Sequence, residues 1–290
     1  MTHIAYVNGR YLPHGEGAVH IEDRGYQFAD GVYEYIAFYN RRMLDAGPHI
    51  RRLLRSLKEL AIPAPMSEAA LQHVMRELIS RNSRDDGGLY IQVTRGVARR
   101  DHPFPKQTKP SLVMTICAAK FPKEAEIRNG VKVITYPDHR WERRDIKSIA
   151  LLPNVLAKQK ATAEKCREAW LLKGDTVTEG AVSNSYIFTK DGTLVTHPAD
   201  THILGGITRD VVLKLAKKAG MKIEERAYTI KEALEAKEAF LTSTSANILP
   251  VVAIDDKPIG NGNPGEFTSK LLAVYAQHVY EQTGRRIACL

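Results

Sequence analysis

Apolar residues recur at helical spacing in one stretch of the first half of the chain and in strand-like runs around it. Within residues 49–60 they lie three or four positions apart, which predicts an amphipathic helix; they are Ile50, Leu53, Leu54, Leu57 and Leu60. Ser67 is a typical N-cap for a second helix that reaches about Ser80. We expect strands at 4–12, 32–44, 89–95 and 112–117, the first folded into a hairpin at Asn8-Gly9 and the second turning at Asn40-Arg41.

The second half alternates between predicted strands and helices. We expect helices at 153–165, 207–219 and 266–282, with a short one behind the capping box Thr229–Glu232. The predicted strands are 131–136, 168–172, 185–189, 194–196, 239–242 and 251–255. The periodic pattern is lost at 118–123, which is the candidate linker. The sequence therefore predicts a mixed α/β (α+β) fold with two domains, a smaller one at 1–120 and a larger one at 121–290.

Composition narrows the class of protein. Of the 290 residues, 43% are hydrophobic and 26% are charged, which is ordinary for a soluble globular protein, and no apolar run is long enough to span a membrane. The net charge is +9, but basic residues alternate with acids and form no stripe interleaved with aromatics, so we expect no nucleic-acid partner. A positive field does suit small anionic substrates.

The cysteine pattern and the first residues bear on compartment and metals. Three cysteines, Cys117, Cys166 and Cys289, show no CxxC spacing, so we expect reduced thiols and no metal site. The first six residues lack the basic and apolar regions of a signal peptide. A cytoplasmic protein is the expectation.

An amine, an acid and two anion-binding loops follow one another along the second half. Lys147 is flanked by apolar residues, Glu179 lies in Thr178-Glu179-Gly180, and the loops are Gly205–Arg209 and Thr242–Thr244. A lysine that forms an imine, an acid that keeps a pyridine nitrogen protonated and backbone N–H groups for a phosphate are what pyridoxal phosphate requires. Taken singly, Lys147 could be a solvated surface lysine and Glu179 an acid in a turn.

The phosphate would be bound where Gly205-Gly206-Ile207-Thr208 opens a predicted helix. Helix N-termini bind phosphate through free N–H groups and the dipole, and glycine allows close approach of the backbone. Arg52, on the first predicted helix, can make a bidentate charged contact with the phosphate. By itself it would be interpreted as a surface arginine.

Together these segments resemble the fold-type IV pyridoxal-phosphate enzymes. The resemblance runs nearly end to end, through Asp30–Glu34, His49–Leu53, Asp145–Ser148, Thr178–Gly180 and Gly206–Arg209. It implies that Lys147 is the catalytic Schiff-base lysine and Glu179 the partner of the pyridine nitrogen. It also assigns a residue near the ring, Leu204, and four phosphate-binding residues, Arg52, Ile207, Thr208 and Thr244. Members of the family are usually homodimers with the cofactor between two domains.

Substrate choice depends on another segment, Thr94–His102. It looks like the loop of D-amino acid aminotransferases, whose Arg-x-His pair, here Arg100 and His102, binds the substrate α-carboxylate together with a tyrosine, here Tyr33. The resemblance implies that this loop acts in the neighbouring subunit's site, although by itself residues 99–102 read as a charged surface loop. Ala181 and Val182 depart from members that carry serines there.

The expected activity is transamination between D-amino acids, such as D-alanine, and 2-oxo acids, such as 2-oxoglutarate. The alternatives within the fold are a branched-chain L-amino acid aminotransferase, an (R)-amine transaminase and aminodeoxychorismate lyase. From another class, the alternative is a non-catalytic cofactor-binding or scaffold protein.

Overall fold

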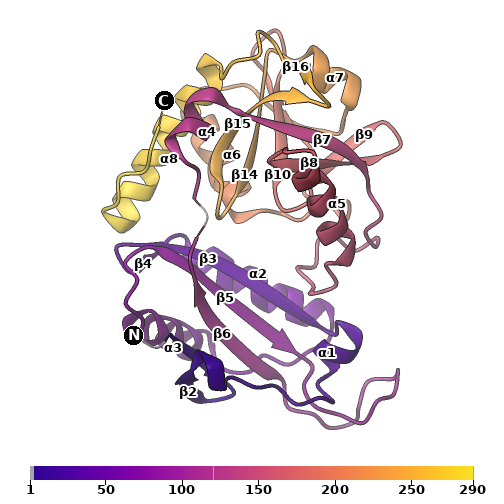
Figure 1. Ribbon diagram of the computed structural model, residues 1–290, viewed down its shortest axis with the longest axis vertical. Coiled ribbons are helices and arrows are strands. Elements are labelled where there is room, and N and C mark those ends of the chain that lie inside the picture. The colour runs from indigo at the N-terminus through magenta and orange to yellow at the C-terminus, as the bar shows by residue number, and fades with distance from the viewer. Residues whose placement is uncertain (1–2, 120, 290) are drawn as a thin grey trace. The chain divides into compact units, whose positions relative to one another are not determined.

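The computed structural model describes residues 3–119 and 121–289, which cluster into two compact units (Figure 1). The N-terminal unit comprises the chain up to Ala119 together with Ile146–Ala150 and Gln282–Gly284, and the C-terminal unit comprises the rest. The segment that carries Lys147 thus packs with the N-terminal unit. The domain limits 1–120 and 121–290 stay a prediction, and residue 120 of the expected linker 118–123 lies outside the described residues.

The N-terminal unit is built on a six-stranded antiparallel sheet in the order β2-β1-β6-β5-β3-β4. Its strands are β1 (Ile4–Val7), β2 (Arg10–Pro13), β3 (Gly31–Tyr39), β4 (Arg42–Met43), β5 (Gly87–Thr94) and β6 (Ser111–Cys117). Its helices are η1 (His14–Glu16), α1 (Arg24–Phe28), α2 (Ala46–Glu59) and α3 (Glu68–Ser80). Both predicted hairpins are confirmed, with positive φ at Asn8, Gly9, Asn40 and Arg41.

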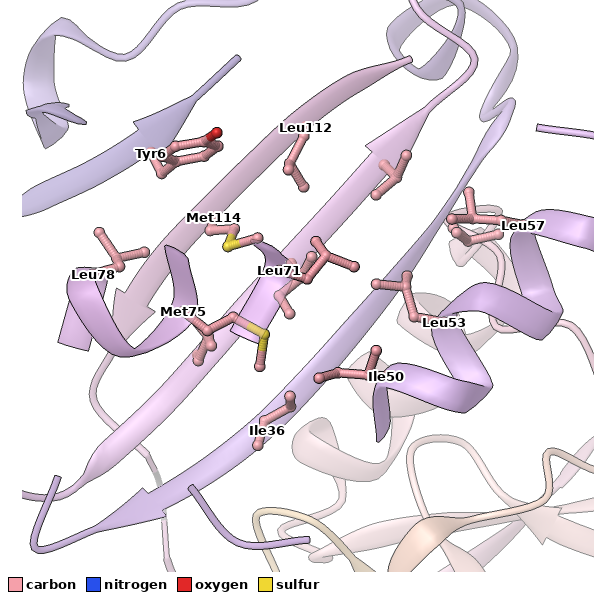
Figure 2. Packing of buried hydrophobic residues seen from close by; sticks show 14 of the residues in the cluster. Tyr6, Ile36, Ile50, Leu53, Leu57, Leu71, Met75, Leu78, Leu112 and Met114 are labelled. Atoms are coloured by element: carbon pink, nitrogen blue, oxygen red, sulfur yellow. The ribbon is translucent and has the colours of Figure 1, made fainter. Parts of the chain in front are cut away.

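Helices α2 and α3 cover one face of this sheet, α2 against β3 and α3 against β6 (Figure 2). Ile50, Leu53 and Leu57 of α2 are almost completely buried, which confirms the apolar spacing read from the sequence. The predicted cap of α3 is also confirmed, since the Ser67 hydroxyl accepts a hydrogen bond from the N–H of Ala70 at 3.3 Å. Burial of each such aliphatic side chain contributes about 1.5–3 kcal/mol, so α2 is anchored firmly on the sheet.

The C-terminal unit contains a ten-stranded mixed sheet in the order β12-β11-β10-β14-β15-β7-β8-β9-β13, with β16 paired to β15. Its parallel pairs are β11 with β12, β7 with β15 and β7 with β8. The strands are β7 (Val131–Pro137), β8 (Glu168–Lys173), β9 (Thr176–Gly180), β10 (Asn184–Phe188), β11 (Leu194–Thr196), β12 (Ile223–Glu225), β13 (Tyr228–Thr229), β14 (Glu238–Ser243), β15 (Asn247–Ile254) and β16 (Lys257–Pro258).

The helices of this part of the chain are α4 (Glu124–Asn129), α5 (Leu152–Ala163), α6 (Ile207–Lys218), α7 (Ile230–Glu235) and α8 (Glu266–Thr283). The predicted capping box of α7 is present, with Thr229 and Glu232 bonded to each other's backbone N–H groups. Parallel and antiparallel pairs in one sheet, with helices between strands, confirm the mixed α/β fold class.

Candidate active site

A short stretch of chain holds Lys147 beside β3. The N–H of Tyr33 donates to the carbonyl of Lys147 at 2.9 Å, and the N–H of Ile149 donates to the carbonyl of Gly31 at 3.1 Å. A Cβ on Gly31 would lie 2.7 Å from the carbonyl oxygen of Val93 and 3.1 Å from Cδ1 of Ile149. Glycine at position 31 is therefore required mainly by the close approach of the β5 backbone, and the Ile149 side chain after Lys147 packs closely over it.

The side chain of Lys147 is partly buried and lies over an aromatic ring. Its Nζ is 4.2 Å from the centroid of the Tyr33 ring, which in turn stacks on Tyr90 at 5.8 Å between centroids. Burial and the neighbouring Tyr33 raise the pKa of Tyr90 to about 12, so this hydroxyl stays protonated at neutral pH. The structure thus brings together two predicted site residues, Lys147 and Tyr33.

Arg52 lies on the inner face of α2, where it is paired with a carboxylate. Its Nε and Nη2 donate to the two oxygens of Glu34 at 3.0 and 2.7 Å, and Nδ1 of His49 lies 3.0 Å from the same carboxylate. Burial alone would raise the pKa of Glu34, but Arg52 and His49 hold it well below its usual range. Burial lowers the pKa of His49, although Glu34 opposes that shift. The phosphate-binding role of Arg52 stays a prediction.

Glu179 lies in a buried strand, β9, and not in a turn. Its Oε1 accepts hydrogen bonds from Nη1 of Arg140 at 2.5 Å and from the N–H of Leu204 at 3.0 Å, while Oε2 accepts one from Nδ2 of Asn184 at 2.9 Å. Burial raises the pKa of the Glu179 carboxyl, and the Arg140 guanidinium opposes this rise. Conversely, burial disfavours the charge of Arg140, yet Glu179 and Asp138 raise its pKa.

The start of α6 has the features of an anion site. Its N-cap, Gly206, provides no side chain to bond the first backbone N–H groups, which therefore remain available to an anion. A Cβ on Gly206 would clash with Oδ1 of Asn184, so the backbone lies directly against that amide. The predicted phosphate residues Ile207 and Thr208 are buried in the first turn. Thr244 is partly buried in the turn after β14.

The two residues predicted to bind the substrate carboxylate, Arg100 and His102, are exposed and lie at one aromatic ring. The guanidinium carbon of Arg100 is 4.6 Å from the centroid of the Phe28 ring, and the imidazole of His102 is 5.5 Å from it. Arg24 holds this loop by donating to the carbonyls of Asp101 and His102. Among the described residues, no hydrogen bond or ring contact joins Tyr33 to either member of the pair.

Four residues of these sites were missed from the sequence: Glu34, Asp138, Arg140 and Asn184. The contacts that reveal two of them join positions far apart along the chain, because Glu34 is 18 positions from Arg52 and Arg140 is 39 positions from Glu179. A charged residue in a short loop carries no periodic signal, so only the folded contacts identify Arg140.

The described residues lack two features that would point to other functions. No cluster of three or more His, Cys, Asp or Glu in this part of the chain could hold a metal ion. Within residues 3–119 and 121–289, no helix is long and apolar enough to cross a membrane.

Comparison with known proteins identifies the family. Residues 31–254 match the amino-transferase class IV family. The chain is 44% identical over 280 residues to the D-alanine aminotransferase of Bacillus licheniformis, with 97% of this chain and 98% of the relative covered. It is 40% identical to the enzyme of the same name from Listeria monocytogenes serotype 4b, with 96% of each chain covered.

Solved structures agree with this assignment. The branched-chain aminotransferase of the archaeon Thermoproteus uzoniensis, solved with norvaline, has a TM-score of 0.84 at 25% identity, covering 97% of this chain and 96% of the other. The branched-chain enzyme of Escherichia coli has a TM-score of 0.88 at 22% identity, covering 98% and 96%, and shows the common fold. Another branched-chain enzyme at 25% identity and a TM-score of 0.87 was solved with pyridoxamine 5'-phosphate. The chain therefore belongs to the amino-transferase class IV family of pyridoxal-phosphate-dependent enzymes, as its sequence motifs predicted.

Proposed function

We propose that this protein transfers the amino group of D-amino acids, such as D-alanine, to 2-oxo acids, such as 2-oxoglutarate. The observation that carries the proposal is the 44% identity over 97% of the chain to a protein named D-alanine aminotransferase. The chemistry of Lys147, of Glu179 and of the start of α6 supports the same reaction.

The residues present fit pyridoxal phosphate. Lys147 would hold it covalently through Nζ, and Glu179 would bind its ring nitrogen. The uncapped N-terminus of α6 and the close approach of the backbone at Gly206 suit its phosphate. When bound, the group withdraws electrons from the substrate and makes the Cα proton acidic. The donor set therefore matches what the family requires.

Lys147 would then move the proton. As a free amine, its Nζ would take the Cα proton of the substrate and would deliver it to the C4′ carbon of the cofactor. Hydrogen bonds to β3 fix the backbone of the short segment that carries Lys147, and its Nζ lies over the Tyr33 ring. A fixed backbone holds Nζ near one position, which supports this role. Glu179 would meanwhile keep a proton on the ring nitrogen.

Arg100, His102 and Tyr33 would bind the substrate α-carboxylate. A guanidinium, an imidazole and a phenol can each donate a hydrogen bond to it. Arg100 and His102 are exposed on a loop that Arg24 holds in place. We infer that they serve the site of a second copy of the chain and that the active protein is a homodimer. The cytoplasmic location expected from the cysteine pattern likewise stays a prediction.

The second candidate is a branched-chain L-amino acid aminotransferase. It is favoured by the solved structure at 25% identity, whose TM-score is 0.84. Higher identity to the D-alanine aminotransferases, 44% and 40%, favours the D-amino acid reaction. A panel of D- and L-amino acids with 2-oxoglutarate separates the two, because wild-type protein that prefers L-leucine or L-valine over D-alanine would overturn the proposal.

The cofactor attachment can be tested directly. Borohydride reduction of the protein loaded with pyridoxal phosphate, followed by peptide mapping, should place the pyridoxyl group on Lys147, and Lys147→Ala should not be labelled. Recovery of the label on Lys158 or Lys160, both on helix α5, would show that the assignment is wrong.

A further inference from the structure

Among the described residues, Glu179 has three hydrogen-bond donors, and only one of these carries a charge. The backbone N–H of Leu204 and the amide of Asn184 are neutral, whereas Arg140 approaches Oε1 with its Nη1 at 2.5 Å. Charge-assisted hydrogen bonds are about twice as strong as neutral ones, so Arg140 dominates both the orientation and the electrostatics of this carboxylate.

Arg140 is itself fixed from behind by Asp138. Its Nε and Nη2 donate to the two oxygens of Asp138 at 2.9 and 2.8 Å, which leaves Nη1 directed at Glu179. Asp138 also accepts a hydrogen bond from the hydroxyl of Thr178 at 2.8 Å. The side chain of Asp138 is completely buried, and that of Arg140 is 8% exposed. The planar guanidinium of Arg140, bonded to Asp138 on one side and to Glu179 on the other, therefore has little freedom to rotate.

The charges around Glu179 balance within this buried cluster. Asp138 and Glu179 are negative, while Arg140 and Arg144 are positive, with Nε of Arg144 3.3 Å from Asp138. Two further titratable groups face the cluster. Glu142 is 3.7 Å from Arg144 but largely exposed, and the buried hydroxyl of Tyr186 has its pKa raised by burial and stays neutral. Arg140 therefore offsets much of the negative charge of Glu179. A proton on a group bound to Glu179 is held less tightly as a result.

We propose that Arg140, held by Asp138, is a positioning residue that fixes the orientation of Glu179 and limits how tightly Glu179 holds a proton on its bound ring nitrogen. The inference rests on the proposed function, because it concerns the group that Glu179 binds. A purely structural role, in which Arg140 only satisfies a buried carboxylate, makes a different prediction about pH.

The test is the pH dependence of the absorbance of the protein loaded with pyridoxal phosphate. Its midpoint is the pH at which half of the bound cofactor has lost a proton. In Arg140→Gln a positive charge next to Glu179 is lost, so protons on neighbouring groups are held more tightly and the spectroscopic midpoint should rise by about one pH unit. In Asp138→Asn a negative charge is lost and the midpoint should fall. Shifts of opposite sign cannot arise from loosened packing alone.

Arg143→Gln is the matched control, because Arg143 is in the same loop but pairs with Asp145 and is 42% exposed. It should leave the midpoint unchanged. Equal midpoints in Arg140→Gln and wild type, or shifts of the same sign in both variants, would overturn the inference. If one of the two variants does not fold, the other decides: an unchanged or lowered midpoint in Arg140→Gln, or an unchanged or raised midpoint in Asp138→Asn, would overturn the inference.

Wild-type protein loaded with pyridoxal phosphate distinguishes failure of the proposed function from failure of the proposed role of Arg140. Wild type that takes up no pyridoxal phosphate would refute the proposed function, and this inference with it. Wild type that binds the cofactor and transaminates D-alanine, with no charge-dependent shift in the variants, would refute only the role of Arg140.

Discussion

At the scale of single residues, the site depends on buried charges that are paired by short hydrogen bonds. Glu34 is completely buried, and its carboxylate is paired with Arg52 and His49. The carboxylate of Glu179 is paired with Arg140. Breaking a buried pair from one side leaves an uncompensated charge, which costs far more than breaking an exposed pair. These residues should therefore affect stability as well as catalysis.

Glu34→Gln should destabilise the protein by about 3–5 kcal/mol at pH 7, because it leaves Arg52 buried without its carboxylate. Urea unfolding measures this change. Glu77→Gln is the matched control: Glu77 pairs with Arg81 on the exposed side of α3, and its loss should cost no more than about 0.5 kcal/mol. Equal losses in the two variants would contradict the burial argument.

The same cluster predicts loss of stability in acid. The pKa of Glu34 is lower in the folded protein than in the unfolded chain, so its contribution is present above the unfolded value and is lost as pH falls through the folded value. His49 acts in the same direction, because its lowered pKa makes the unfolded chain the better proton acceptor. The free energy of unfolding should therefore fall from about pH 6.5 downward through His49, and the further fall below about pH 4.5, which Glu34 contributes, should be absent in Glu34→Gln.

At the scale of elements, the start of α6 is defined by how closely its backbone approaches β10. Gly206 has φ −71°, a conformation that any residue adopts, so the requirement for glycine there comes from contact with Asn184 and not from the backbone. A Cβ added at the adjacent Gly205 would have its nearest neighbour 3.8 Å away, at Cβ of Ala199, which is an ordinary contact. The two glycines thus form a natural pair for comparison.

Gly206→Ala should weaken binding of pyridoxal phosphate about 10- to 100-fold, because the added methyl displaces the Asn184 amide at an overpacking cost of about 1–3 kcal/mol. Gly205→Ala should bind the cofactor like wild type. Titration of each apoprotein with pyridoxal phosphate, followed by absorbance, gives both affinities. If Gly205→Ala proves the weaker binder, the close contact at Gly206 is not what shapes the site.

At the scale of the whole molecule, the proposed dimer makes each active site depend on two chains. Lys147 would come from one chain and Arg100 from the other, so the two residues can be inactivated separately. Arg100→Ala alone should reduce kcat/KM for D-alanine and D-glutamate alike by about 10- to 150-fold, through loss of a charged hydrogen bond worth about 1.5–3 kcal/mol. Arg99→Ala, next to it on the exposed loop, should have little effect.

Mixing the two impaired variants, Lys147→Ala and Arg100→Ala, provides the sharper measurement. After subunit exchange, Lys147→Ala and Arg100→Ala should together recover about one quarter of wild-type activity, because half of the dimers are mixed and each mixed dimer has one intact site. If Arg100 served its own chain, mixing would recover no activity beyond the residual activity of Arg100→Ala. A protein that sediments as a monomer while fully active would also contradict the proposed assembly.

The sequence by itself determined the secondary structure wherever side chains repeat with a clear period or a turn needs a special residue. The apolar spacing of 49–60 predicted α2, Asn8-Gly9 predicted the first hairpin, and Thr229–Glu232 predicted the cap of α7, because each is a local property of the chain. Family motifs also predicted the class of enzyme, through Lys147, Glu179 and the glycines before α6.

Only the tertiary structure decided which groups neighbour these residues. β9 was missed because its short, largely polar sequence, Thr176–Gly180, has no amphipathic alternation, and it becomes a strand through pairing with β8 and β13. Arg140 was missed because a charge in an irregular loop gains its role only when folding places it 2.5 Å from Glu179. Local pattern determines elements, whereas buried charge pairing between distant positions is decided by how those elements pack.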